Sequence, residues 1–341
     1  MTYIRFLYSI TFLIALCTPL SVSAQQMIGS IQVVDDALNE LIDPESQLEI
    51  LADGFIWTEG PVWIEDEGYL LFSDVYSNQI FQWQPDSSAK VFLEPSGYTG
   101  TEERGGGLGS NGLTLDSDGH LLIAQHGDRR IAQFIGDMMN PQPEFLPIAQ
   151  TYQGAKLNSP NDLVFHSNGT LYFTDPAYGL IQGLSDPSKE LDYQGVFSVT
   201  PNGTISLLDS VLSHPNGIAF SPDEKTLYVS NSNAEEAIWM AYDVLPDGKV
   251  DNRRVFFDAT PMVGGESSGI PDGLKVDVNG NIFATGPGGI LVFHPDGTHL
   301  GTINTTRPTA NCAFGDDGRM LYVTAEMYLL RVPLLTQGAI P

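Results

Sequence analysis

Residues 214–223 read His-Pro-Asn-Gly-Ile-Ala-Phe-Ser-Pro-Asp, and the apolar run Leu-Tyr-Val-Ser follows at residues 227–230. The order is turn, short strand, turn, strand, because Pro, Gly, Asn and Asp favour turns and the apolar runs between them favour strands. Asn216 stands at the start of the first strand, and its side chain carries a free carbonyl oxygen. The same pattern occurs five more times, so this unit organises the whole chain.

Each of the other copies begins with Glu, Asn or Asp and continues through a short strand, an Asp-Gly, Asn-Gly or Glu-Gly turn and a second apolar strand. Their leading residues are Glu59, Asn111, Asn161, Asp272 and Asn311. Successive copies begin about 40 to 55 residues apart, which is the period of β-propeller blades. The sequence therefore predicts an all-β, six-bladed β-propeller. The innermost strand of each blade faces the central channel, so six oxygen-bearing side chains are expected to converge on one axis.

The first 24 residues have the composition of an export signal. Arg5 is the only charge, residues 6–16 are almost wholly apolar, and Val22-Ser23-Ala24 resembles a small-residue cleavage site. The apolar run is too short to span a membrane. We expect a signal peptide at residues 1–24, cleavage after Ala24, a periplasmic or secreted protein, and no membrane association once the signal is removed.

Residues 25–46 are expected to form an N-terminal leader with a short helix that ends at Pro44. Apolar residues there follow helical spacing: Val33, Val34, Ala37, Leu38, Leu41 and Ile42. The propeller is expected to occupy residues 47–341. An apolar strand at residues 48–52 precedes the first copy, and the last copy ends soon after Val332. We expect the early strand to complete the last blade, which closes the ring and removes its exposed edges.

The charge balance restricts the partners. The chain has 15 Lys and Arg against 42 Asp and Glu, a net charge of −27. Such a surface repels nucleic acid and anionic lipid, but it admits neutral ligands and attracts cations. Cys312 is the only cysteine beyond the signal, so an intramolecular disulfide is excluded from the mature chain.

Four of the leading residues form a candidate metal site. Two carboxylates and two amide oxygens suit a hard divalent cation, Ca²⁺, Mg²⁺ or Mn²⁺, rather than zinc. These residues are Glu59, Asn161, Asn216 and Asp272. In a single copy, Asn or Asp would more often be a turn cap. Six copies in phase favour an axial metal site.

Two other classes of function remain open at this level. A non-catalytic propeller could bind a protein or a glycan at its rim, and a different hydrolase, acting on an aryl ester or a phosphotriester, could use the same metal site.

His126 ends an inner strand of the second copy. It could reach the channel, or it could be a structural histidine.

Four motifs in this order resemble the SMP-30/gluconolactonase/luciferin-regenerating-enzyme family, above all its secreted bacterial gluconolactonases. They are Trp57-Thr58-Glu59-Gly60-Pro61, Ser159-Pro160-Asn161-Asp162, Pro215-Asn216-Gly217 and Ile270-Pro271-Asp272-Gly273. The resemblance covers essentially the whole mature chain. It implies a six-bladed propeller that holds one divalent ion, usually Ca²⁺, and hydrolyses a sugar lactone to its aldonic acid.

The same resemblance implies roles for individual residues. Glu59, Asn161, Asn216 and Asp272 correspond to the family's metal ligands, although the residue matching Asn161 is a ligand in some members and a substrate contact in others. Asp272 also corresponds to the family's acid/base. Ser159 stands where animal-type members carry an arginine, so contacts to sugar hydroxyls are expected to differ.

The catalytic base is left open by the chemistry. A metal-bound carboxylate has a lowered pKa and is a weak base, so Asp175, His126 and Asp162 are further candidates for removing a proton from water. Contacts to the small-molecule lactone are expected from Asn111, Ser159, Asp162 and Tyr178.

Overall fold

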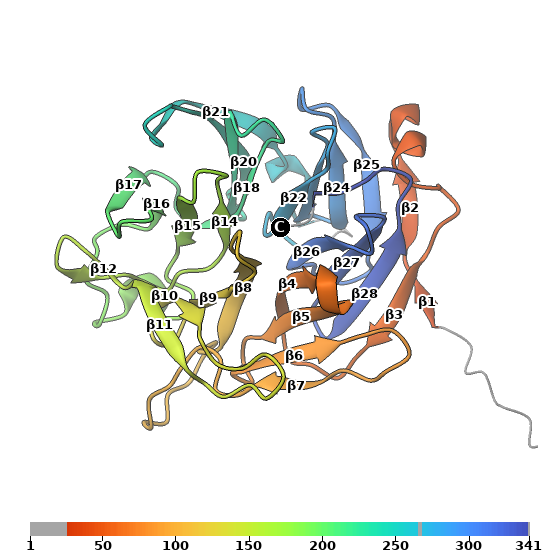
Figure 1. Ribbon diagram of the computed structural model, residues 1–341. Helices are drawn as coiled ribbons and strands as arrows, with labels where there is room; N and C mark the ends of the chain where they lie inside the picture. Colours follow the sequence, from red (N-terminus) through yellow and green to blue (C-terminus); the bar gives the residue numbers. More distant parts are fainter. Residues whose placement is uncertain (1–25, 265–267, 340–341) are drawn as a thin grey trace, which may run out of the picture.

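The computed structural model describes residues 26–264 and 268–339. The expected signal peptide at residues 1–24 lies outside them. Within the described residues, six sheets of four or five strands surround a central axis, and Figure 1 shows them as the blades of a propeller. The predicted six-bladed all-β fold is confirmed.

The first three blades follow one another along the chain. Blade 1 contains β4 (Thr58–Ile64), β5 (Tyr69–Asp74), β6 (Gln79–Trp83) and β7 (Lys90–Leu93). Blade 2 contains β8 (Ser110–Leu115), β9 (Leu121–Gln125), β10 (Arg130–Phe134) and β11 (Phe145–Ala149). Blade 3 contains β14 (Leu163–Phe165), β15 (Leu171–Asp175), β16 (Gly195–Val199) and β17 (Ile205–Asp209). Every neighbouring pair is antiparallel.

The last three blades complete the circle. Blade 4 contains β18 (Pro215–Phe220), β19 (Thr226–Asn233), β20 (Glu236–Val244) and β21 (Val250–Asp258). Blade 5 contains β22 (Leu274–Val276), β23 (Ile282–Gly286), β24 (Gly289–Phe293) and β25 (His299–Asn304). Blade 6 contains β26 (Asn311–Gly315), β27 (Met320–Ala325) and β28 (Tyr328–Pro333). The innermost strands β4, β8, β14, β18, β22 and β26 each contact the next, and β26 contacts β4.

The second strands of the blades are apolar on both faces because each blade packs between two others. Leu70, Leu71 and Phe72 of β5 have no exposed surface. A strand buried on both faces reads as a continuous apolar run rather than an alternating one. The hairpin turns that join the first and second strands use glycines with positive φ, 80° at Gly119 and 82° at Gly169.

The ring closes between the two ends of the fold, as predicted. Strand β3 (Leu48–Ala52) pairs antiparallel with β28, with Ile50 opposite Leu330. Beside this pairing, Arg331 Nε donates a hydrogen bond of 2.7 Å to Glu49 Oε2. An early strand thus supplies the outer part of blade 6.

Two further strands tie residues 26–33 to the propeller. Strand β1 (Met27–Ile28) pairs with β3 in blade 6, and β2 (Ser30–Val33) pairs with β25 in blade 5. The segment expected to be a separate leader therefore extends two neighbouring sheets.

The helix expected in this segment is a short 3-10 helix, η1 (Asp36–Glu40), in which the Ala37 N–H donates to the capping side chain of Asp35. Leu38, Leu41 and Ile42 are buried, as their spacing predicts. Val33 and Val34 are exposed, and Val33 lies in β2. Their assignment to the helix is wrong because a short apolar run fits a strand as well as a helix.

The remaining elements are short connections. They are β12 (Thr151–Tyr152), β13 (Ala155–Lys156), η2 (Glu65–Glu67), η3 (Gly183–Ser185) and η4 (Thr260–Met262). A helix with the length and apolar character needed to cross a membrane is absent from the part of the chain described above.

Candidate metal centre and active site

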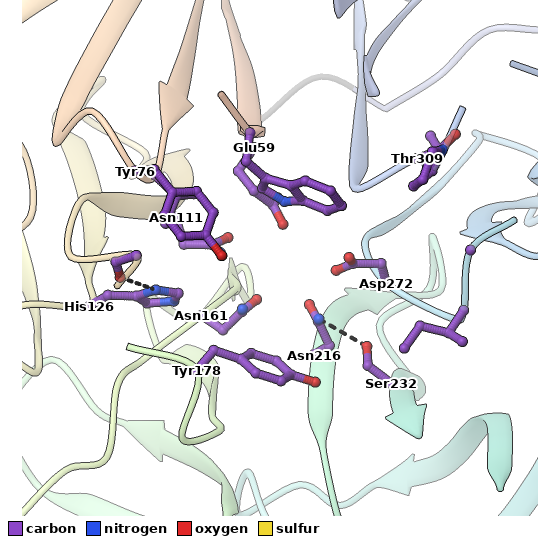
Figure 2. Close-up of a pocket in the computed structure, with 16 residues that line it drawn as sticks. Glu59, Tyr76, Asn111, His126, Asn161, Tyr178, Asn216, Ser232, Asp272 and Thr309 are labelled. Carbon is purple, nitrogen blue, oxygen red and sulfur yellow. Dashed lines mark hydrogen bonds between the residues drawn. The ribbon is translucent and has the colours of Figure 1, made fainter. Parts of the chain in front are cut away.

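A cavity of about 340 Å³ lies where the inner strands meet the axis. Five of the six leading residues line it, and Figure 2 shows their side chains directed toward one another. They are Glu59 in β4, Asn111 in β8, Asn161 just before β14, Asn216 in β18 and Asp272 just before β22. The predicted convergence of these five residues is therefore present in the structure.

Four oxygens in this group are buried without a hydrogen-bond partner among the described residues: Oδ1 of Asn111, Asn161, Asn216 and Asp272. A buried carbonyl or carboxylate oxygen without a partner is costly, and such atoms are rare in folded proteins. Their common direction indicates a ligand that accepts lone pairs. The donor set of amide and carboxylate oxygens fits a hard divalent cation.

The orientation of one amide is fixed by its neighbour. Asn216 Nδ2 donates a hydrogen bond of 2.9 Å to Ser232 Oγ, drawn as a dashed line in Figure 2. Since the nitrogen is engaged there, the Asn216 Oδ1 atom is left facing the axis. This is the direction needed for an oxygen ligand.

The buried carboxylates of Glu59 and Asp272 also favour the binding of a cation. Burial raises the pKa of Glu59, against hydrogen bonds from the Gly60 N–H and the Asn311 and Asn111 amides that lower it. Burial raises the pKa of Asp272 as well, and the negative charges of Glu59 and Asp162 add to the rise. Carboxylates crowded into a medium of low dielectric constant repel one another, and a divalent ion between them removes that cost.

Glycines bring the leading residues close together. A Cβ on Gly60 would lie 2.0 Å from the carbonyl oxygen of Asn111, and one on Gly217 would lie 2.3 Å from that of Asp272. Any larger residue would push the inner strands apart. The Gly that follows a leading residue is therefore needed for adjacent blades to approach the axis.

His126 lines the cavity and remains a candidate base. Its Nδ1 is 3.3 Å from the Gly107 carbonyl oxygen, so Nδ1 carries the proton in the tautomer that forms this hydrogen bond. Its Nε2 is buried and has no hydrogen-bond partner within residues 26–264 and 268–339. Burial lowers the pKa of His126 to about 4, so the imidazole is neutral near pH 7 and Nε2 is available to accept a hydrogen bond.

Asp175 does not face the cavity. Its Oδ2 accepts from the Asn158 N–H and its Oδ1 from the Ser159 N–H, both at 2.8 Å. Burial raises the pKa of Asp175 to about 7, while these hydrogen bonds lower it. The proposed catalytic role is wrong for this geometry, because both oxygens are committed to the loop that leads to Asn161.

Ser159 is also turned away from the cavity. Its hydroxyl donates to the Pro176 carbonyl at 2.7 Å and accepts from the Gly179 N–H at 2.8 Å. The predicted contact between Ser159 and substrate is not supported, because the side chain that replaces the animal-type arginine is used within its own blade.

Asp162 is another predicted substrate contact that does not line the cavity. Its Oδ1 accepts from the Leu163 N–H at 2.9 Å, and its Oδ2 is 3.4 Å from Asn311 Nδ2. Asn311 Oδ1 accepts from the Cys312 N–H and lies 3.4 Å from Lys275 Nζ. Asn311, the leading residue of the sixth copy, thus directs its nitrogen rather than its oxygen at the carboxylates.

Tyr178 and Asn111 keep their predicted place in the cavity. The Tyr178 ring stacks on His214, with ring centroids 6.0 Å apart and an interplanar angle of 24°. Burial raises the pKa of the Tyr178 phenol, so its hydroxyl stays protonated and is a hydrogen-bond donor at neutral pH. Both residues are positioned to contact a bound molecule.

An apolar wall was not predicted from the sequence. Trp57, Val75, Tyr76, Ile270 and Pro308 line the cavity beside the oxygen-bearing residues. Three lining residues stand two positions before a leading residue, namely Trp57, Ile270 and Thr309. That offset is a signal in the repeat which could have identified part of the wall.

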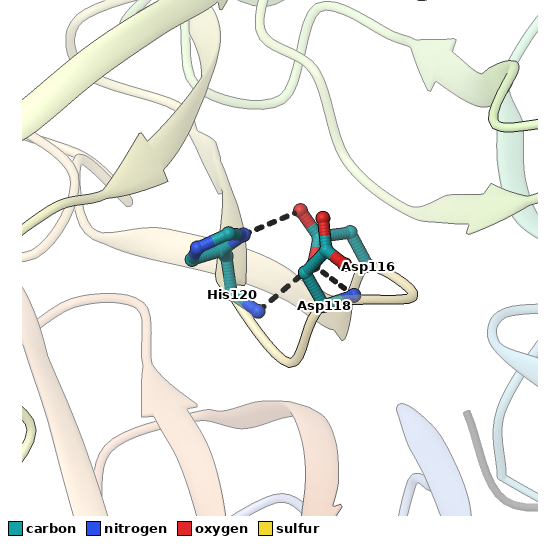
Figure 3. A group of neighbouring side chains, drawn as sticks. All are labelled: Asp116, Asp118 and His120. Carbon is teal, nitrogen blue, oxygen red and sulfur yellow. Dashed lines mark hydrogen bonds and ion pairs between the residues drawn. The ribbon is translucent and has the colours of Figure 1, made fainter.

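A second group of possible metal ligands lies outside the cavity. The side-chain ligand atoms of Asp116, Asp118 and His120 lie within 4.8 Å of one another in the turn between β8 and β9 (Figure 3). Asp116 Oδ1 already accepts from the Asp118 and His120 N–H groups, and its Oδ2 pairs with His120 Nδ1, each at 2.9 Å. These bonds account for the cluster as a stabilised exposed turn.

Comparison with known proteins agrees with this geometry. Residues 57–327 match the family described as the SMP-30/Gluconolactonase/LRE-like region. The chain is 38% identical to a gluconolactonase of Zymomonas mobilis over 317 residues, which cover 91% of this chain and 88% of that protein. It is 30% identical to a pentonolactonase of Haloferax volcanii, over 78% of this chain and 80% of that one.

Solved structures show the same architecture. A gluconolactonase from Xanthomonas campestris superposes with a TM-score of 0.76 and 30% identity, covering 92% of this chain and all but 1% of that one. A luciferin-regenerating enzyme superposes with a TM-score of 0.68 at 18% identity, which shows the shared fold alone. With the family match over most of its length, the chain belongs to the SMP-30/gluconolactonase/LRE-like family.

Proposed function

We propose that the protein is a metal-dependent lactonase that hydrolyses a neutral sugar lactone to its aldonic acid with a divalent cation, preferentially Ca²⁺, in the axial cavity. The observation that carries the proposal is the set of three amide oxygens and one Asp272 oxygen that are buried without partners among the described residues and converge beside Glu59. The names of the relatives, a gluconolactonase and a pentonolactonase, support the substrate class.

Glu59, Asn161, Asn216 and Asp272 are the residues that would hold the ion. A divalent ion bound there supplies Lewis-acid polarisation of a carbonyl and stabilises the negative charge that develops on its oxygen. The Oδ1 atom of Asn111 would accept a hydrogen bond from a hydroxyl of the lactone, and the hydroxyl of Tyr178 would donate one to it. The apolar wall formed by Trp57 and its neighbours excludes water from one side of the cavity and faces the carbon skeleton of the ring.

The proton released by the attacking water can be taken by either of two lining side chains. Asp272 corresponds to the family's acid/base, but a carboxylate that also binds a cation is a weak base. His126 offers a neutral Nε2 with no partner among the described residues, but a pKa lowered to about 4 makes it a weak base as well. The His126→Gln variant separates them. A fall in kcat of about 100-fold or more with unchanged metal affinity assigns proton removal to His126, and a kcat within a few-fold of the wild type assigns it to Asp272.

The apolar wall gives a specific reason to test a second class of substrate. Trp57, Tyr76 and Ile270 would also accommodate the aromatic group of an aryl ester or of a phosphotriester. The same ion would polarise a carbonyl or a phosphoryl oxygen. Such a hydrolase is the alternative if sugar lactones are not substrates.

The decisive experiment follows acid release with a pH indicator over a panel of sugar lactones, with calcium and with a chelator. We expect hydrolysis that requires calcium and that is lost in Glu59→Gln and Asp272→Asn. Glu49→Gln is the matched control, since Glu49 is a partly buried carboxylate paired with Arg331 away from the axis. Calcium-loaded protein that opens none of these lactones faster than buffer would contradict the proposal and direct the panel to aryl esters and phosphotriesters.

Export is part of the proposal. The composition of residues 1–24 supports a signal peptide and a periplasmic or secreted enzyme. Mass spectrometry of the mature protein recovered outside the cytoplasm should find an N-terminus at Gln25. A cytoplasmic protein that retains residues 1–24 would contradict this location.

A further inference from the structure

Two buried hydroxyls connect successive blades beside the candidate metal centre. Thr174 lies in β15 of blade 3, and Ser230 lies in β19 of blade 4. Neither side chain has exposed surface, and neither is among the residues that line the cavity. Their contacts are therefore with the protein itself.

Thr174 joins the peptide groups of two leading segments. Its Oγ1 accepts a hydrogen bond of 3.2 Å from the N–H of Asp162, the residue after Asn161. The same hydroxyl donates a hydrogen bond of 2.6 Å to the carbonyl oxygen of Asn216 in the next blade. One side chain thus links the backbones that carry two of the proposed ligands.

Ser230 repeats this arrangement one blade further on. Its Oγ accepts from the Gly217 N–H at 2.7 Å and donates to the Asp272 carbonyl oxygen at 2.6 Å. Gly217 follows Asn216 in the chain. The two hydroxyls therefore connect the segments of Asn161, Asn216 and Asp272 in one continuous series of hydrogen bonds.

We propose that Thr174 and Ser230 are positioning residues that fix the separation of Asn161, Asn216 and Asp272, and so set the affinity of the axial site for a divalent cation. The inference rests on the metal site of the proposed function. Ligand distances in a metal site are expected within about 0.2 Å of their standard values, and each ligand side chain moves with its own peptide group. Bonds between peptide groups of different blades are the direct means of holding that distance.

Blade 6 shows what the same position does when its hydroxyl bonds only to a residue that is not itself a proposed ligand. Thr324 of β27 is fully buried, and its hydroxyl accepts from the N–H of Asn311 and donates to the carbonyl of that residue, both at 3.1 Å. These bonds stay within one blade. Thr324 is therefore a matched control for Thr174, with the same residue type, burial and strand position.

The test measures calcium affinity by titration calorimetry on the intact protein after removal of metal, without substrate. We expect Thr174→Val and Ser230→Ala to raise the dissociation constant for Ca²⁺ about 10-fold, the lower end of the range for partners that orient ligands. Thr174→Ser keeps the hydroxyl, and Thr324→Val removes one that bonds only to Asn311, which is not a proposed ligand. Both should stay within about two-fold of the wild type.

Thermal unfolding of the metal-free proteins separates positioning from general stability. Thr174→Val and Thr324→Val each remove a buried hydroxyl and should lower Tm to a similar extent. The proposal is overturned if Thr174→Val binds Ca²⁺ as the wild type does, or if Thr324→Val loses as much affinity as Thr174→Val. A wild type that binds no Ca²⁺ overturns it together with the metal site, whereas one that binds Ca²⁺ but opens no lactone overturns only the proposed activity.

Discussion

His126 shows at the scale of a single residue how burial controls chemistry. The residue is only 2% exposed although it lines the cavity, and burial lowers the pKa of its imidazole to about 4. In the unfolded chain a histidine binds a proton below about pH 6.5. Between these values the unfolded state binds more protons than the folded state, so the free energy of unfolding falls as the pH falls from 6.5 toward 4.

The contribution of His126 to this fall is on the order of 3 kcal/mol at pH 4. We expect His126→Gln to lose less stability than the wild type between pH 7 and pH 4.5. Denaturant unfolding at both pH values measures the difference, with exposed His294→Gln as a control. An equal loss of stability in His126→Gln and the wild type would show that His126 is protonated in the folded state.

Asp175 illustrates a residue whose role depends on hydrogen-bond direction. Both of its oxygens accept backbone N–H groups, so in Asp175→Asn the amide nitrogen would face one of these donors. We expect a loss of about 1–3 kcal/mol in the free energy of unfolding and no change in the shape of the pH–rate profile. Asp74→Asn is the matched comparison, because Asp74 accepts from Ile56 and Trp57 in blade 1. A stable Asp175→Asn protein with an altered pH profile would restore a catalytic role.

These residues mark how far the sequence could predict the site. Glu59, Asn161, Asn216 and Asp272 recur at one phase of a repeat, and the fold converts that phase into a common direction. Asp175 has the right chemical type and the wrong orientation. A sequence lists donors and acceptors, but it does not say which backbone groups they satisfy.

At the scale of elements, the closing strand β3 was predictable and β2 was not. The apolar run at residues 48–52 is a strand that lies outside the repeat, and the sixth copy is too short to supply an outer strand for blade 6. The early strand therefore fits the vacant position in blade 6. For residues 30–33, the sequence showed no blade that lacked a strand, because blade 5 already has four strands of its own. The apolar pair Val33-Val34 also agreed with helical spacing. Only the tertiary pairing with β25 decides between strand and helix there.

Leu48 tests the importance of the closure. Its side chain is fully buried in the cluster formed by η1 and blades 5 and 6. We expect Leu48→Ala to lower the free energy of unfolding by about 2–5 kcal/mol, the range for large-to-small substitutions in a core. Val91→Ala in the exposed outer strand β7 should change it by less than about 0.5 kcal/mol.

Calcium affinity is the second measurement on the Leu48→Ala and Val91→Ala proteins. Leu48 lies away from the proposed axial ligands, so its effect on stability should be separable from metal binding. We expect both variants to bind Ca²⁺ as the wild type does. A Leu48→Ala protein of unchanged stability would mean that β3 does not hold the ring closed. Altered affinity in a folded Leu48→Ala protein would mean that closure is transmitted to the axis.

At the scale of the whole molecule, the repeat gives the number of blades and the axis, but the chemistry of the cavity wall comes from loops. Val75, Tyr76 and Pro308 follow or precede strands at positions that the repeat does not fix. Loops vary independently of the strands they join. The axial site was therefore accessible from the sequence, whereas the shape that selects a substrate required the structure.

The distribution of charge over the molecule makes a prediction about substrates. The chain carries a net charge of −27, and Lys and Arg are absent from the cavity lining within the described residues. His126 adds no positive charge near pH 7 because burial lowers its pKa to about 4. A metal ion bound as proposed would supply positive charge at the axis, but Glu59 and Asp272 would balance it.

A neutral lactone can therefore enter this field freely, whereas an anionic one is repelled both by the surface and inside the cavity. We expect glucono-δ-lactone to be hydrolysed with a kcat/KM roughly 100-fold greater than that of the same lactone bearing a 6-phosphate, within the 10–10³-fold range over which fields of this kind alter encounter rates. Added salt screens the long-range part, so the ratio should narrow between low ionic strength and about 0.15 M. Equal rates for the two lactones, or a preference for the phosphorylated one, would require a cationic contact that the lining residues do not provide. If the ratio of the two kcat/KM values does not change with salt, the discrimination arises inside the cavity. The phosphate would then be disfavoured because no lining side chain pairs with it directly.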